Sequence, residues 1–104
     1  GKKLAALDME LDGVMIDIKS ITGNGWYSHA LRVKNNQLRR YNNRPDSPAP
    51  ASRVCLYFHE AELFDDIKMR KSIDYFKQHL EGTCYIKHII CVINGRDGIL
   101  EYDV

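Results

Sequence analysis

The stretch from Leu7 to Ser20 alternates apolar and charged residues on both sides of an Asp-Gly pair. Successive side chains of a β-strand face opposite sides, and Asp-Gly favours a tight two-residue turn. The stretch therefore predicts a β-hairpin of two strands, Leu4–Leu11 and Val14–Ser20. Counting outward from an Asp12-Gly13 turn gives the cross-strand pairs Leu11–Val14, Glu10–Met15, Met9–Ile16 and Asp8–Asp17.

One face of this hairpin is charged. Asp8 and Asp17 are directly opposite each other in this register, and like charges at such positions destabilise a sheet. A cation between them removes the repulsion, and Mg²⁺ is often bound by one or two carboxylates and water. Glu10 and Lys19 share this face, where Lys19 can hold a water or a phosphate oxygen near a metal. The alternative is a solvent-facing hairpin with scattered charges.

The rest of the chain predicts a mixed α/β fold. Apolar periodicity and turn residues predict further strands at Trp26–Val33, Arg53–His59, Cys84–Ile93 and Ile99–Val104, and helices at Lys34–Asn42 and Glu60–Leu80. The long helix rests on a stripe at helical spacing that comprises Leu63, Ile67, Ile73, Phe76 and Leu80, followed by Gly82 as a stop. Loops are expected at 22–25 and 42–52, and a turn at 94–98. The run Ile89–Ile93 is apolar on both faces, which indicates an interior strand.

Length and composition are those of a globular domain. The 104 residues suit one domain, 1–104, with 44% apolar and 28% charged residues. No apolar run is long enough to cross a membrane, so we expect no membrane partner. Cys55, Cys84 and Cys91 lack metal-binding spacing and lie in strand-like runs, which favours buried free thiols over a disulfide or a metal site and predicts a cytoplasmic protein.

Basic residues are concentrated in one block. Residues 32–53 carry six basic side chains against Asp46 alone, a net charge of +5, whereas the segments before and after are acidic. Such a block is typical of a surface that binds a polyanion. The alternative is a solvated face whose charge is balanced elsewhere in the fold.

Two motifs resemble those of a known family. The segment GVMIDIKS resembles the central motif of the PD-(D/E)xK nuclease superfamily, in which the second core strand carries an acid, any residue and a lysine, here Asp17, Ile18 and Lys19. The first acid of the family lies on the preceding strand, where Asp8 stands, although the proline of the motif is replaced by leucine. The segment QLRRY, 37–41, resembles the Q-x-x-x-Y helix of RecB-like members.

The resemblance covers about residues 4–59 and implies a restriction-endonuclease-like core, with a central mixed sheet led by a hairpin and flanked by helices. It implies a nuclease that depends on Mg²⁺ or Mn²⁺ and acts on DNA in restriction, recombination or repair. Asp8, Asp17 and the Ile18 carbonyl would bind the metal, Lys19 would act on the water or the transition state, and Glu10 would assist. The residues expected to contact nucleic acid are Arg32, Lys34, Gln37, Arg39, Arg40, Tyr41 and Arg44.

Other interpretations remain open at this point. A catalytically inactive module that binds nucleic acid, and a small protein-interaction or inhibitor domain with an acidic hairpin, are the alternative functions. We expect so small a core to act as a homodimer or as part of a larger protein. Trp26 and Tyr27 either stack on a base or pack in the core, and His59 is either a site residue or a strand-end residue.

Overall fold

The computed structural model describes residues 9–11, 14–23, 25–45 and 51–104, and for 9–11 and 14–17 the backbone alone. Its elements in chain order are strands β1 (Met9–Leu11) and β2 (Val14–Ile21), helix α1 (Ser28–Asn42), strand β3 (Arg53–Phe58), the short 3₁₀ helix η1 (Ala61–Leu63), helix α2 (Asp66–Gln78), and strands β4 (His88–Ile93) and β5 (Leu100–Asp103). The predicted mixed α/β class is confirmed.

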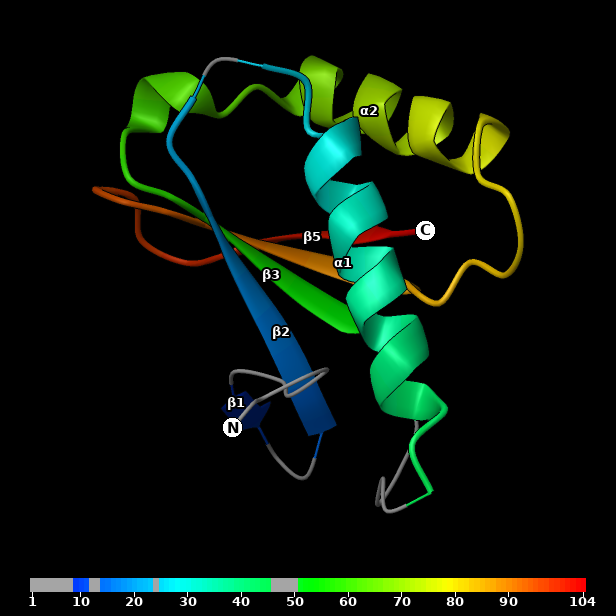
Figure 1. Ribbon diagram of the computed structural model, residues 1–104. Coiled ribbons are helices and arrows are strands. Elements are labelled where there is room, and N and C mark those ends of the chain that lie inside the picture. Colours follow the sequence, from blue (N-terminus) through cyan, green and yellow to red (C-terminus); the bar gives the residue numbers. More distant parts are fainter. Residues whose placement is uncertain (1–8, 12–13, 24, 46–50) are drawn as a thin grey trace.

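The five strands form one mixed sheet in the order β1-β2-β3-β4-β5. The three inner strands are parallel, and each edge strand is antiparallel to its neighbour. Helix α1 connects β2 to β3, and α2 connects β3 to β4. Because such crossovers are right-handed and both advance in the same direction, the two helices cover the same face of the sheet (Figure 1).

The hairpin register predicted from the sequence is confirmed for its described pairs. Leu11 pairs with Val14, Glu10 with Met15, and Met9 with Ile16. The next pair outward in this register is Asp8–Asp17. Asp8 and the Asp12-Gly13 turn lie outside the described residues. The same holds for residues 4–7 of the expected first strand.

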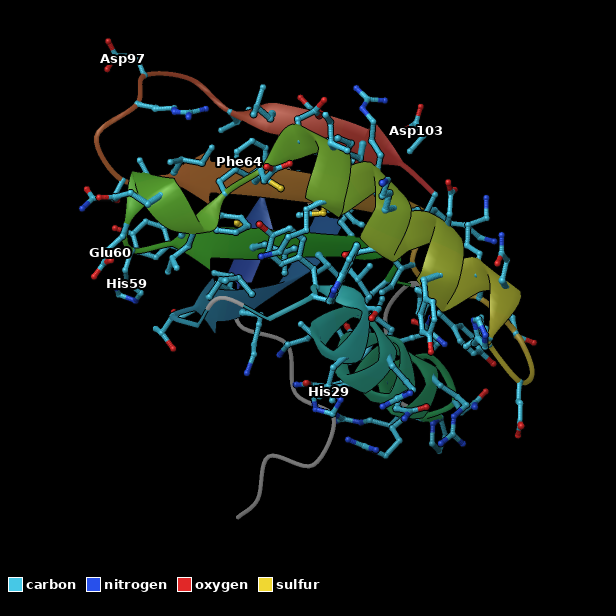
Figure 2. The ribbon with its side chains drawn as sticks, turned by 90° about the horizontal axis from the view of Figure 1, so that it is seen from above. His29, His59, Glu60, Phe64, Asp97 and Asp103 are labelled. Carbon is cyan, nitrogen blue, oxygen red and sulfur yellow. The ribbon has the colours of Figure 1, made fainter. Side chains whose placement is uncertain are left out.

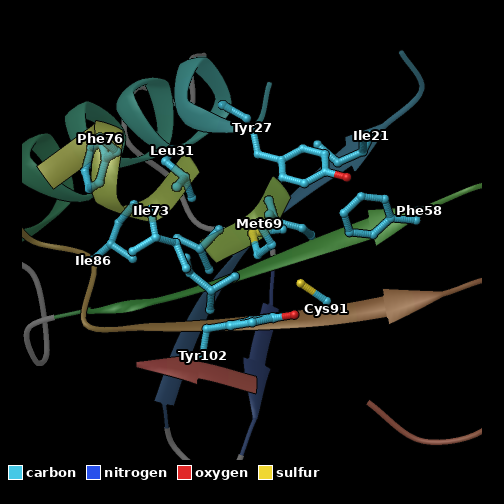
Figure 3. Close-up of a cluster of buried hydrophobic side chains, with 14 of the residues drawn as sticks. Ile21, Tyr27, Leu31, Phe58, Met69, Ile73, Phe76, Ile86, Cys91 and Tyr102 are labelled. Atoms are coloured by element: carbon cyan, nitrogen blue, oxygen red, sulfur yellow. The ribbon is translucent and has the colours of Figure 1, made fainter. Parts of the chain in front are cut away.

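The core lies between the sheet and the two helices (Figure 3). Alternate residues of β3, namely Val54, Leu56 and Phe58, are fully buried, as the two-residue period of a strand requires. In β4 the consecutive residues Ile89, Ile90 and Cys91 are all buried, so the interior strand expected at 89–93 is confirmed. The strand begins at His88 and not at Cys84.

The strand predicted at Trp26–Val33 is wrong, because these residues enter helix α1 at Ser28. The short helix expected at 34–42 is the second half of α1. A run of eight residues, five of them apolar, fits both strand and helix periods, so the outcome depends on packing. Here Leu31, Leu38 and Tyr41 are buried at spacings of seven and three residues, as on one face of a helix, and α1 packs against β2 and α2.

The long helix predicted at Glu60–Leu80 is interrupted. Asp65 has an extended backbone, and its carboxylate accepts a hydrogen bond of 2.8 Å from the main-chain N–H of Lys68, so α2 starts afresh with an N-cap. Ile67 was expected on the apolar stripe but is 66% exposed. The buried side of α2 is formed by Met69, Ser72, Ile73 and Phe76.

Two asparagines attach α1 to distant parts of the chain. Buried Asn35 donates to the carbonyl of Thr83 and accepts from the N–H groups of Tyr85 and Ile86. The side chain of Asn42 forms a reciprocal pair of hydrogen bonds with the main chain of Ala51. These bonds attach to α1 the segments that lead into β4 and β3.

The three cysteines are free, as expected, but only Cys91 is buried, while Cys55 and Cys84 are half-buried. Burial of Cys91 raises the pKa of its thiol to about 12. Among the described residues, neither helix combines the length and the apolar character that a membrane span needs.

Candidate functional site

The acid-x-lysine triplet lies in β2. Position 17 pairs with Val54 and position 19 with Leu56 of the neighbouring parallel strand, so both belong to the face of the sheet on which the helices lie. Helix α1 packs against β2. Lys19 is nevertheless exposed, and it lines a hollow of about 210 Å³ beside the β2–α1 connection.

The segment QLRRY is helical, which confirms the helix expected for it. Gln37 and Tyr41 lie one turn apart on α1, and Gln37 accepts a hydrogen bond of 3.1 Å from the ammonium group of Lys34. Lys34 is 8% exposed and Tyr41 is 5% exposed. This side of α1 is therefore largely buried, and its polar groups are buried with it.

Four of the residues expected to contact phosphates are exposed on α1 or just after it. Arg32, Arg39 and Arg40 are exposed on α1, and Arg44 is exposed just after it. We call these four residues the basic surface. Lys34 and Tyr41 were expected with them, but their burial removes them from it. Burial of charge is costly unless it is compensated, and for Lys34 the carbonyl oxygen of Gln37 provides part of that compensation.

The expected metal site falls on residues that the structure describes only in part. Asp8 lies outside the described residues, and Asp17, Glu10 and the turn between them are described at most by their backbone. Among the side chains that are described, no group of three or more His, Cys, Asp or Glu residues is arranged to hold a metal ion. The metal ligands assigned from the sequence therefore stay a prediction.

His29 is a residue that sequence reasoning missed. It lies in the first turn of α1, borders the same hollow as Lys19, and its Nδ1 is 3.2 Å from a guanidinium nitrogen of Arg32. The strand prediction for 26–33 concealed this, since a helix turn and not a strand brings His29 beside β2. Figure 2 shows His29 at α1, well away from His59 and Glu60.

His59 has the strand-end role. It follows β3, its carbonyl accepts a hydrogen bond of 3.0 Å from the side chain of Asn94, and its ring contacts Tyr57 edge to face. These contacts connect the end of β3 to the turn after β4. No described contact joins His59 to the Lys19 hollow.

Trp26 and Tyr27 have opposite environments. Tyr27 is 1% exposed, and its hydroxyl donates to the carbonyl of Leu63 and accepts from the N–H of Asp65. Burial raises the pKa of the Tyr27 phenol. Trp26 is 58% exposed and borders the Lys19 hollow. Of the two roles expected for this pair, Tyr27 takes the core role, and Trp26 is left on the surface.

Comparisons with known proteins identify no relative of this chain. No family model matches it, and neither the curated proteins nor the solved structures include a significant match.

Proposed function

We propose that this domain is a metal-dependent nuclease of the PD-(D/E)xK type that hydrolyses phosphodiester bonds in DNA. The observation that carries the proposal is the hairpin register. The three described pairs follow the register in which Asp8 and Asp17 are the next pair outward. In that arrangement the two carboxylates need a cation, and Lys19 lies on the same strand face as Asp17.

The order of elements supports the proposal further. The strand with the acid-x-lysine triplet is followed by a helix that bears Gln37 and Tyr41, and then by a strand parallel to the first. The resemblance implies three strands before the helix within residues 4–59. The order agrees in its first two strands, its helix and the strand that follows, and differs at 26–33, where α1 replaces the third strand. Helix α2 and the hairpin of β4 and β5 extend the sheet and the core beyond it.

Each group has a distinct role in this proposal. Asp8 and Asp17 would hold a divalent metal, which would supply polarisation of the scissile phosphate and a lower pKa for a bound water. The Lys19 ammonium group, exposed in its hollow, offsets negative charge that develops on the phosphate in the transition state. The basic surface holds the flanking phosphates, and such contacts give affinity with little sequence specificity.

The experiment is a cleavage panel with plasmid DNA, single-stranded DNA, and RNA, each with Mg²⁺, Mn²⁺ or EDTA. The nuclease cleaves at least one substrate with metal and none with EDTA, and Asp17→Asn abolishes cleavage. Binding of DNA without cleavage under every condition would instead identify an inactive binding module. Neither binding nor cleavage would identify a protein-interaction domain.

A further inference from the structure

A groove runs between the start of α1 and the C-terminal half of α2, two helices that pack against each other. Its volume is about 570 Å³, within the range of pockets that take small organic groups. The residues that line it are Trp26, Ser28, Lys71, Asp74, Tyr75 and Gln78. The proposed cleavage chemistry uses none of them.

Two large aromatic side chains border this groove and remain exposed. Trp26 is 58% exposed and Tyr75 is 52% exposed. The adjacent Tyr27 is 1% exposed, so the chain buries an aromatic ring at this very place while it leaves Trp26 in solvent. Exposed aromatic residues that gather at one hollow mark a binding surface, whereas single exposed apolar residues are ordinary.

The aromatic surface continues past Tyr75. The rings of Tyr75 and His79 are stacked, with centroids 4.0 Å apart and planes 22° apart. A second hollow of about 310 Å³ adjoins the groove, shares Ser28 and Tyr75 with it, and is also bordered by His79 and Arg32. The groove thus offers flat rings at two places along its length.

Charged groups along the two hollows have both signs. Lys71 and Arg32 supply cations, and Asp74 and Glu81 supply carboxylates. A duplex backbone requires a continuous row of cations, which this groove lacks. Unpaired bases require stacking faces, acceptors for their amino groups and a few cations for their phosphates, and these are present here.

Trp26 connects the groove with the proposed site. It borders both the groove and the separate hollow that contains Lys19 and His29. A base stacked on Trp26 therefore has its own phosphate, or a neighbouring one, beside the Lys19 hollow. The sequence of features along this surface is Lys19, Trp26 and then Tyr75.

We infer that this groove binds unpaired nucleotides of the substrate strand, with bases stacked on Trp26 and Tyr75. The inference rests on the proposed function, since it places a single-stranded segment next to the cleavage site. The substrate class is then nucleic acid that contains unpaired nucleotides. DNA and RNA share this chemistry, so both are included in the test.

The test measures binding in EDTA, which separates binding from cleavage. Trp26 is the single tryptophan of the chain, so its fluorescence reports directly on the groove. The probes are single-stranded 12-mers of DNA and of RNA, and the corresponding DNA duplex. Single strands should quench the tryptophan at saturation. Trp26→Ala and Tyr75→Ala, measured by fluorescence anisotropy of labelled strands, should each weaken binding about 5- to 100-fold.

Controls keep the result specific. Trp26→Phe and Tyr75→Phe retain a ring and should bind within about threefold of the wild type, and Ile99→Ala removes an equally exposed apolar residue from another surface. Unquenched fluorescence with saturating single strands, or alanine variants that bind like the wild type, would overturn the inference. A duplex that quenches as strongly as the single strand would overturn it as well.

The two proposals fail in different ways. If the wild type cleaves with Mg²⁺ while Trp26→Ala binds single strands normally, the groove assignment is wrong and the nuclease assignment stands. If single strands quench Trp26 but nothing is cleaved with any metal, the groove assignment stands and the nuclease assignment is wrong.

Discussion

The hydroxyl of Tyr27 donates a hydrogen bond of 2.5 Å to the carbonyl of Leu63, 36 residues away in the chain. The same hydroxyl accepts a bond from the N–H of Asp65, the N-cap of α2, and the N–H of Tyr27 itself donates to the Ser72 hydroxyl. The ring packs edge to face on Phe58 with centroids 5.5 Å apart. Tyr27 thus attaches the β2–α1 connection, which carries Trp26, to the junction of η1 and α2 and to the middle of α2.

Tyr27→Phe should therefore destabilise the domain. The variant keeps the ring packing but leaves a buried carbonyl and an N–H without their partner, a loss of about 1–3 kcal/mol in the free energy of unfolding. Urea denaturation followed by circular dichroism measures it. Tyr75→Phe is the matched control, because its hydroxyl is on an exposed side chain. Equal stability of both variants would show that the Tyr27 hydroxyl contributes little.

Metal should stabilise the wild type if Asp8 and Asp17 form a metal site. A ligand that binds only the folded state at 100 times its Kd contributes about 2.7 kcal/mol, or roughly 10 °C in Tm for a domain of this size. Asp17→Asn should melt no lower than the wild type without metal, because it removes a like-charge repulsion, and should lose the shift. Differential scanning fluorimetry with millimolar Mg²⁺ or Mn²⁺ measures both effects. A strongly destabilised Asp17→Asn, with no shift in the wild type, would make the carboxylate structural.

Lys19→Ala should abolish cleavage and leave folding and DNA binding nearly intact. Lys19 is exposed, so its loss removes little packing, whereas its charge is proposed to act on the transition state. Single-turnover cleavage and a thermal melt are the two measurements. Lys87→Ala removes another exposed lysine, far from position 19 in the chain, and should cleave like the wild type. Full activity of Lys19→Ala would remove Lys19 from the site.

The basic surface should determine the salt dependence of DNA binding. Replacing both Arg39 and Arg40 by alanine removes two phosphate contacts, so the slope of log K against log salt should decrease by about 2 for duplex DNA. Fluorescence anisotropy at several salt concentrations measures the slope. The double variant Lys77→Ala, Lys87→Ala removes two exposed cations from other surfaces and should keep the wild-type slope. An unchanged slope for the arginine variant would mean that these residues are merely solvated.

The buried thiol of Cys91 should make the domain less stable at high pH. Its pKa is raised from 9.0 to about 12 by burial and by the neighbouring Cys55. The folded state therefore holds this proton more tightly than the unfolded chain, so its contribution is full below pH 9 and is lost as the pH rises toward 12. Urea denaturation between pH 7 and 11 should show a smaller pH dependence for Cys91→Ala than for the wild type. Identical pH dependence would place the alkaline loss in other groups, such as Tyr102 and Tyr27, whose pKa values are also raised.

The sequence by itself determined the parts of the fold that depend on residues close together in the chain. The Asp-Gly pair and the alternation of apolar and charged residues predicted the hairpin register, because the length of the turn sets which residues lie opposite each other on the two strands. The run Ile89–Ile93 identified an interior strand, because only an interior position buries both faces of a strand. The helix that includes residues 37–41 was also predicted from the spacing of residues in the sequence.

Only the tertiary structure decided which side chains are exposed and which segments meet. Residues 26–33 fit two periods, and packing of Leu31 and Ala30 against the rest of the core selected the helix that brings His29 beside Lys19. Nothing in the order of residues distinguishes Trp26 from Tyr27, or Lys34 from Arg39. Their exposure depends on where α2 and the sheet lie, and those positions come from contacts between residues tens of positions apart, such as that of Tyr27 with Leu63.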